Sequence, residues 1–194
     1  MAITGLILAG GRGSRMGGVD KGLQVLRGKP MIEWVLARFA PQVDEVLINA
    51  NQNVERYARL GPRVVPDDIG GYAGPLAGLH AGLQVAAHPL VATCPCDSPF
   101  LPPDLVARLR AALERDGADL AVAKTGEQPH PVFSLVRRDA LPGLARFLES
   151  GGRKIDAWYS GLKTVEVRFD DEAEAFSNIN TREELRAWDD VPPG

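Results

Sequence analysis

The sequence lacks an excess of positive charge. Its 194 residues include 22 Lys and Arg against 25 Asp and Glu, which gives a formal net charge of -3 at pH 7. A protein that binds nucleic acid normally carries a basic excess, because it must neutralise the polynucleotide backbone. The composition therefore argues against a nucleic-acid-binding surface.

Long apolar runs are also missing. No stretch approaches the roughly 20 residues that a bilayer-crossing helix needs, and the N-terminus has no basic segment leading into a signal-peptide core. We expect a cytoplasmic protein with no membrane partner, and we expect it to act as a monomer.

Cysteine is scarce, with only Cys94 and Cys96 in the chain. Alternate positions on a strand point to the same face, but such neighbours seldom satisfy the geometry of a disulfide. We expect two buried free thiols. The histidines, His80, His88 and His130, show no zinc-ligand spacing relative to the cysteines.

The residues that are present suit one globular domain. The length allows a substantial core, and 45% of the residues are hydrophobic. Strand-like apolar segments alternate with segments of helical periodicity, and parallel strands need such a crossover between them. We predict an α/β fold: a single Rossmann-like three-layer domain over residues 1–190, with a mostly parallel sheet and helices on both faces, and a flexible tail at 191–194.

The apolar patterns place the individual elements. We expect strands at 3–8, 45–51, 63–66, 90–94, 118–123, 132–136 and 164–169. We expect helices from Pro30 through 38, at 54–60, from Pro75 onward, and at 104–115, 144–148, 155–159 and 183–188. A polar loop that includes Gln128 and His130 is expected between the strands at 118–123 and 132–136.

The first strand runs into a glycine-rich segment, residues 9–21, that carries Arg12, Arg15 and Lys21. Glycines let a backbone approach an oxyanion closely, and the three cations would neutralise a triphosphate. The dinucleotide fingerprint fails here because its third glycine falls on Met16, and the P-loop pattern fails around Lys21. The segment therefore indicates a phosphate-binding loop of another kind, with a plain surface turn as the alternative.

Polar side chains follow three other strands. In an open α/β sheet, ligands lie beyond the carboxyl ends of the strands, so the 10–15 loop, Asn49, Asp67 and Asp97 should converge on one site. Taken alone, Asp67 could be a turn or cap residue, as could its neighbour Asp68. Asp97 directly follows a buried strand, and a carboxylate there suits Mg2+, which typically takes one or two carboxylates.

Several motifs carry a family resemblance. The first is Leu8-Ala9-Gly10-Gly11 followed by Arg15-Met16-Gly17 and Asp20-Lys21, and the later segments are 74–78 (GPLAG), 94–99 (CPCDSP), 130–131 (HP) and 178–181 (NINT). Together they resemble the molybdenum cofactor guanylyltransferases, within the wider nucleotidyltransferase superfamily. The first half of the signature is shared with sugar-phosphate and polyol-phosphate nucleotidyltransferases, whereas the later segments, in the same order, extend the similarity over nearly the whole chain.

The resemblance implies a reaction, in which the terminal phosphate of molybdopterin attacks the α-phosphorus of GTP, GMP joins the pterin and pyrophosphate leaves. It implies Mg2+ on Asp97, and GTP, molybdopterin and molybdoenzyme maturation proteins as partners. The residues assigned to GTP are Leu8, Ala9, Gly10, Gly11, Arg15, Lys21, Asn49, Asp67, Gly78 and Asp97. Those assigned to catalysis are Arg15, Lys21, Asp97 and Asn180, and those assigned to the pterin are Arg153, Asn178, Asn180 and His130.

Some of these assignments have structural alternatives. Asn178 and Asn180 precede an expected helix, where Asn is a common cap, and Arg153 could belong to a solvated surface pair. Gly78 could serve helix-sheet packing instead of ligand contact. His130 could be purely structural.

The sequence also leaves rival functions open. The motif arginine and lysine address phosphates, so they do not choose the base, and a cytidylyltransferase acting on the same pterin or a sugar-phosphate nucleotidyltransferase fits the residues too. A rival from another class is a protein that binds and delivers the cofactor without catalysis. A phosphate monoester, whose second pKa is about 6, is already largely a dianion at neutral pH, so the transfer reaction needs no protein base.

Overall fold

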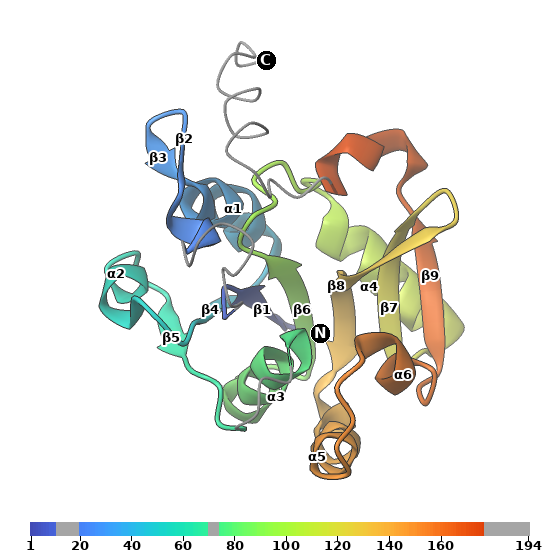
Figure 1. The fold of residues 1–194 in the computed structure, drawn as a ribbon. Helices are drawn as coiled ribbons and strands as arrows, with labels where there is room; N and C mark the ends of the chain where they lie inside the picture. The colour runs from blue at the N-terminus through green and yellow to red at the C-terminus, as the bar shows by residue number, and fades with distance from the viewer. Residues whose placement is uncertain (11–19, 70–73, 177–194) are drawn as a thin grey trace.

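The computed structural model describes residues 1–10, 20–69 and 74–176, and these form one seven-stranded sheet with helices around it (Figure 1). The central strands are short apolar runs of the kind that is buried on both faces of a parallel sheet. In spatial order the strands are β5 (Arg63–Val65), β4 (Glu45–Asn49), β1 (Ile3–Leu8), β6 (Leu90–Pro95), β8 (Gln128–Arg137), β7 (Leu120–Thr125) and β9 (Thr164–Arg168).

The sheet is mostly parallel, as predicted. β5, β4, β1 and β6 run parallel, and β9 runs parallel to β7, whereas β8 is antiparallel to both β6 and β7. The exception follows from the connection, since only Gly126 and Glu127 separate β7 from β8 and so short a turn can join only antiparallel strands. The expected polar loop around Gln128 and His130 is wrong: both residues lie in β8, where they pair with β7.

Helices cover both faces of the sheet, which confirms the three-layer prediction (Figure 1). Alternation along β1 shows the two faces, because Ile3 and Ile7 belong to one apolar core and Leu6 belongs to the other. The first core is completed by α1 (Met31–Phe39), α4 (Leu105–Asp116) and Tyr57 of α2 (Val54–Ala58). The second core is completed by α3 (Pro75–Val85), α5 (Leu141–Glu149) and α6 (Ile155–Tyr159).

Several element boundaries differ from expectation. Pro30 is not the first residue of a helix but the last residue of a small hairpin, β2 (Val25–Leu26) and β3 (Lys29–Pro30), and its extended ψ of 140° leaves Met31 to begin α1. Four 3-10 turns complete the described chain: η2 (Lys21–Leu23), η3 (Ala40–Gln42), η4 (Arg138–Ala140) and η5 (Asp170–Phe176). The expected helix at 183–188 and the tail at 191–194 lie outside the described residues. Within the described ranges, no helix has the length and apolar character of a membrane span.

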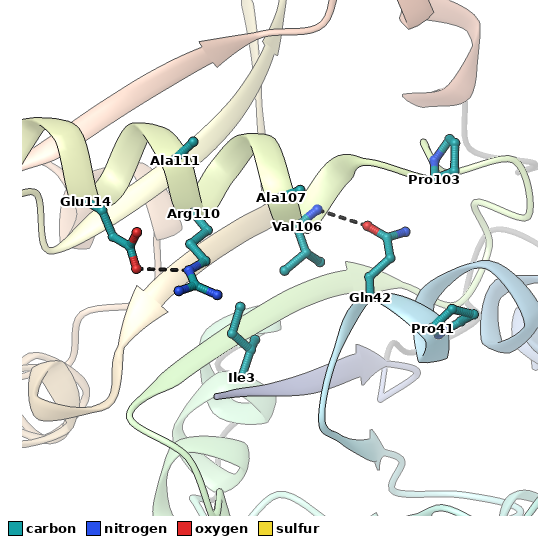
Figure 2. A pocket seen from close by; sticks show the side chains of 9 residues that line it. All are labelled: Ile3, Pro41, Gln42, Pro103, Val106, Ala107, Arg110, Ala111 and Glu114. Carbon is teal, nitrogen blue, oxygen red and sulfur yellow. Dashed lines mark hydrogen bonds and ion pairs between the residues drawn. The ribbon is translucent and has the colours of Figure 1, made fainter. Parts of the chain in front are cut away.

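A hollow of about 500 Å3 opens between α4 and η3, close to the amino end of β1 (Figure 2). Gln42 of η3 reaches across it, and its Oε1 accepts a hydrogen bond of 3.0 Å from the backbone N–H of Val106 in the first turn of α4. Arg110 and Glu114 pair at 2.9 Å along the same helix. Ile3 lines the hollow, so it lies at the amino edge of the sheet, opposite the edge where the sequence predicts the site.

Candidate active site

The structure brings Lys21 and Asp97 together, although 76 positions separate them in the chain. β6 ends at Pro95, the N–H of Cys96 still donates to the carbonyl of Leu8 at 3.2 Å, and Asp97 follows. Lys21 begins η2, and its Nζ lies 3.1 Å from Oδ2 of Asp97. The carboxylate is nearly buried, with Asp97 only 6% exposed. A buried carboxylate needs such a partner, and the pair places a cation and an anion at the carboxyl edge of the sheet.

Asn49 organises a second group of polar side chains on the other side of β1. It ends β4 and is only 2% exposed. Its Nδ2 donates to the carbonyl of Val65 at 3.1 Å and to Oδ1 of Asp67 at 2.8 Å. Asn51 completes the arrangement, because its Nδ2 donates to Oδ2 of Asp67 at 2.8 Å and its Oδ1 accepts from the N–H of Asp67. Two amides therefore hold Asp67, and Asp67 caps none of the helices in the described part of the chain.

Two glycines pack directly against Asn49. A Cβ built on Gly10 would lie 2.7 Å from Oδ1 of Asn49, and one built on Gly78 would lie 2.3 Å from the same atom. The Gly78 Cβ would also lie 2.8 Å from Cδ2 of Leu8. The packing interpretation of Gly78 is thus supported by the structure, and its contact with GTP remains a prediction.

β1 lies between the two groups and joins them. Leu8, its last residue, is in register with Asn49 on one side and with Pro95 on the other, and the N–H of Ala9 donates to the carbonyl of Asn49 at 2.8 Å. β1 therefore brings Gly10, Asn49, Asp67 and Asp97 to one edge of the sheet. The catalytic and GTP-binding roles of these side chains remain predictions. The predicted site residues Gly11, Arg15, Asn178 and Asn180 lie outside the described residues.

Asp20 is the centre of a group that the sequence did not single out. The buried hydroxyl of Tyr57 donates to its Oδ1, and Nδ2 of Asn53 donates to its Oδ2 at 3.0 Å. Asn53 directly precedes α2 and Tyr57 lies within it, 33 and 37 positions further along the chain. The position of Asp20 immediately before Lys21 was the signal that could have drawn attention to it.

The two cysteines are buried free thiols, as predicted. Burial raises the pKa of both, and the nearby Asp97 carboxylate raises each further. Both therefore stay protonated at neutral pH, which makes them poor nucleophiles and poor metal ligands. Across residues 1–10, 20–69 and 74–176, no three His, Cys, Asp or Glu side chains gather closely enough to hold a metal ion.

The two predicted pterin residues that the structure describes are both engaged by the protein. His130 stacks on Phe176 with the ring centroids 4.8 Å apart, and its Nε2 lies 2.7 Å from Oγ1 of Thr125. Burial lowers the pKa of His130. Nη1 of Arg153 donates to the carbonyls of Leu148 and Gly152, at 2.8 and 2.7 Å, just beyond the C-terminal end of α5. Arg153 is therefore tied to backbone, and the pterin roles of both residues remain predictions.

Solved structures share this fold. A molybdopterin-guanine dinucleotide biosynthesis protein A from Archaeoglobus fulgidus is 27% identical, with a TM-score of 0.79 and 96% of each chain covered. A 2-C-methyl-D-erythritol 4-phosphate cytidylyltransferase from Thermus thermophilus has a TM-score of 0.70 at 19% identity, with 97% of this chain and 96% of that chain covered. The model of the MobA-like NTP transferase domain matches residues 5–165. Fold and site together define an α/β nucleotidyltransferase.

Closer relatives narrow the class. The molybdenum cofactor guanylyltransferase of Cupriavidus taiwanensis is 53% identical over 190 residues, which is 95% of each chain. That of Burkholderia ambifaria is 52% identical over 195 residues, covering 96% of this chain and 95% of the relative. This chain belongs to the molybdenum cofactor guanylyltransferase family.

Proposed function

We propose that the protein transfers GMP from GTP to the terminal phosphate of molybdopterin, forming the guanine dinucleotide cofactor and pyrophosphate. The observation that carries the proposal is the ion pair of 3.1 Å between Lys21 and Asp97, beside the group formed by Asn49 and Asp67. It lies where nucleotides bind in open α/β sheets. The names of the relatives and of the Archaeoglobus fulgidus protein support guanine as the base and molybdopterin as the acceptor.

Asp97 fits a magnesium site. Mg2+ usually binds one or two carboxylates and takes its other ligands from substrate phosphates and water, so one nearly buried carboxylate at a strand end is a suitable donor set. Bound there, Mg2+ would supply positive charge to the phosphates as they react. Lys21 would then turn from Asp97 toward the triphosphate, as a second cation that stabilises the charge on the leaving pyrophosphate.

The remaining residues of the site would bind and orient the nucleotide. Gly10 presents backbone without a side chain at the end of β1, which lets the phosphates or the ribose approach closely. Asn49 and Asp67 are joined by a hydrogen bond of 2.8 Å, which would present both side chains to the nucleoside in one fixed arrangement. The acceptor phosphate oxygen forms a bond to the α-phosphorus as the bond from that phosphorus to the bridging oxygen breaks. Because this phosphate is already a dianion, no side chain has to remove a proton.

The test is pyrophosphate release with purified molybdopterin and each of the four nucleoside triphosphates. We expect release with GTP and Mg2+, and we expect Asp97→Ala to abolish it while the variant keeps its fold. Asp139→Ala is the control, because Asp139 is an exposed carboxylate in η4, outside the proposed site. Preferential use of CTP would overturn the choice of base. Nucleotide binding without pyrophosphate release would favour a delivery protein.

A further inference from the structure

Asp20 is a carboxylate next to Lys21 in the chain, and neutral groups satisfy both of its oxygens. The Tyr57 hydroxyl donates to Oδ1, and the Asn53 amide donates to Oδ2 at 3.0 Å. Its backbone is fixed too, since its carbonyl accepts from the N–H of Leu23 at 3.3 Å. The residue before the site lysine is therefore held through side chain and main chain alike.

Tyr57 is well suited to hold the Asp20 carboxylate in place. The side chain is 0% exposed and belongs to the core between α1, α4 and the sheet, so its ring has one position. Burial raises the pKa of the phenol well above its ordinary value, with Cys96 and Asp20 adding to the rise. The hydroxyl therefore stays protonated at every physiological pH and remains a donor to the carboxylate.

Gly22 shows how closely the turn sits on Tyr57. A Cβ at Gly22 would lie 2.7 Å from the Tyr57 hydroxyl oxygen and 3.2 Å from Sγ of Cys96. The turn that carries Lys21 is thus enclosed between Tyr57 and the residue that precedes Asp97. Any shift of Tyr57 would move this turn relative to Asp97.

We propose that Tyr57 and Asn53 are positioning residues, which hold the Asp20 carboxylate and so direct Lys21 toward Asp97 and the phosphates of the nucleotide. This inference rests on the proposed function. A carboxylate beside a lysine competes for its ammonium group, and the two neutral donors remove that competition by satisfying the carboxylate. Without the hydroxyl, an oxygen of Asp20 needs another donor, and Lys21 is the cation next to it in the chain.

The experiment compares Tyr57→Phe with Tyr159→Phe. Tyr159 is also a buried tyrosine, and its hydroxyl donates to the carbonyl of Pro131 at 2.6 Å from the other face of the sheet. Each change removes one buried hydroxyl, and because the Tyr159 hydroxyl also bonds to Oγ of Ser134 at 3.2 Å, both changes should cost some stability. Initial rates of pyrophosphate release give KM for GTP at saturating molybdopterin, under conditions where circular dichroism shows both variants to be folded.

We expect Tyr57→Phe to raise KM for GTP about tenfold, the factor typical of one lost hydrogen bond to a charged group. Tyr159→Phe should leave it unchanged. The effect of Tyr57→Phe should vanish in an Asp20→Asn background, where no charge remains to be held. A merely structural role would reduce the folded fraction, and therefore kcat, without changing KM. An unchanged KM in Tyr57→Phe, an equal rise in Tyr159→Phe, or an undiminished effect beside Asp20→Asn would overturn the inference.

The two proposals can fail separately. If the wild-type protein transfers no nucleotide to molybdopterin, the proposed function fails. The dissociation constant of Mg-GTP, measured by titration calorimetry on the same variants, still decides the positioning role, because that role concerns the phosphates of the nucleotide. A tenfold weaker binding in Tyr57→Phe alone supports it, and equal binding by all variants refutes it.

Discussion

Gly78→Ala tests the closeness of α3 to the site. The added Cβ would lie 2.3 Å from Oδ1 and 2.7 Å from Cγ of Asn49. Asn49 cannot turn away without losing its hydrogen bonds to the carbonyl of Val65 and to Asp67. Either those bonds break or the helix moves, and overpacking of this kind costs about 1–3 kcal/mol. The higher helix propensity of Ala offsets at most about 1 kcal/mol of this loss in unfolding free energy.

We therefore expect a net loss of about 1–2 kcal/mol, which lowers Tm by roughly 2–8 °C in a domain of this size. Thermal unfolding followed by circular dichroism measures it. Gly143→Ala is the matched control, because Gly143 also lies in a helix, α5, and nothing stands within 4 Å of its added Cβ. That variant should unfold at the wild-type temperature or slightly above. A Gly78→Ala protein as stable as Gly143→Ala would refute the packing of α3 against Asn49.

The remaining predictions concern thiols, pH and one amide. Because burial raises the pKa of Cys94 and Cys96, neither should react with a disulfide reagent at pH 8 in the folded protein, and both should react in denaturant; rapid labelling without denaturant would contradict this. The pKa of His130 is lowered from its ordinary 6.5, so the unfolded chain binds more protons between the two values and the unfolding free energy should fall as pH drops below about 6.5. His130→Phe, which can still stack on Phe176, should reduce that fall in urea titrations, and an unchanged pH dependence would count against it. Asn51→Ala removes one of the two amides that donate to the Asp67 carboxylate, so KM for GTP should rise severalfold with little change in Tm. An unaltered KM would show that Asn51 has no part in GTP binding.

The sequence predicted the site best where the pattern of a single strand and the residues after it were sufficient. β1, β4 and β6 are apolar runs, Asn49 ends β4 and Asp97 comes two residues after β6, so the rule for strand ends was enough to place Asn49 and Asp97 at one edge. The distance in sequence between Asp67 and Asp97 did not contribute to this prediction. The parallel order of the strands alone brings them together.

The first half of β8 was missed for a physical reason. Pro129 and Pro131 have no N–H to donate, so a segment that contains them reads as a loop. Among the described strands, β6 pairs only with residues 134–137 of β8, and the first residues of β8 pair with β7 alone. A proline is tolerated there because one side of the strand needs no partner.

The contacts around Asp20 could not be predicted from the sequence either. Tyr57 reads as an ordinary core position of a short helix, and Asn53 as a residue before a helix. Their contact with Asp20 depends on how α2 docks against the turn at Lys21, which no local pattern encodes. Sequence reasoning found Lys21, Asp97 and the pair of Asn49 and Asp67, and it missed the neutral groups that hold Asp20.

The most direct test of the account is the position of the metal in crystals grown with GTP and Mn2+, which replaces Mg2+ and has a measurable anomalous signal. We predict one strong anomalous peak bonded directly to the Asp97 carboxylate and to the triphosphate, with Nζ of Lys21 on the same phosphates. A nucleotide bound at another edge of the sheet, or a metal with no bond to Asp97, would contradict it.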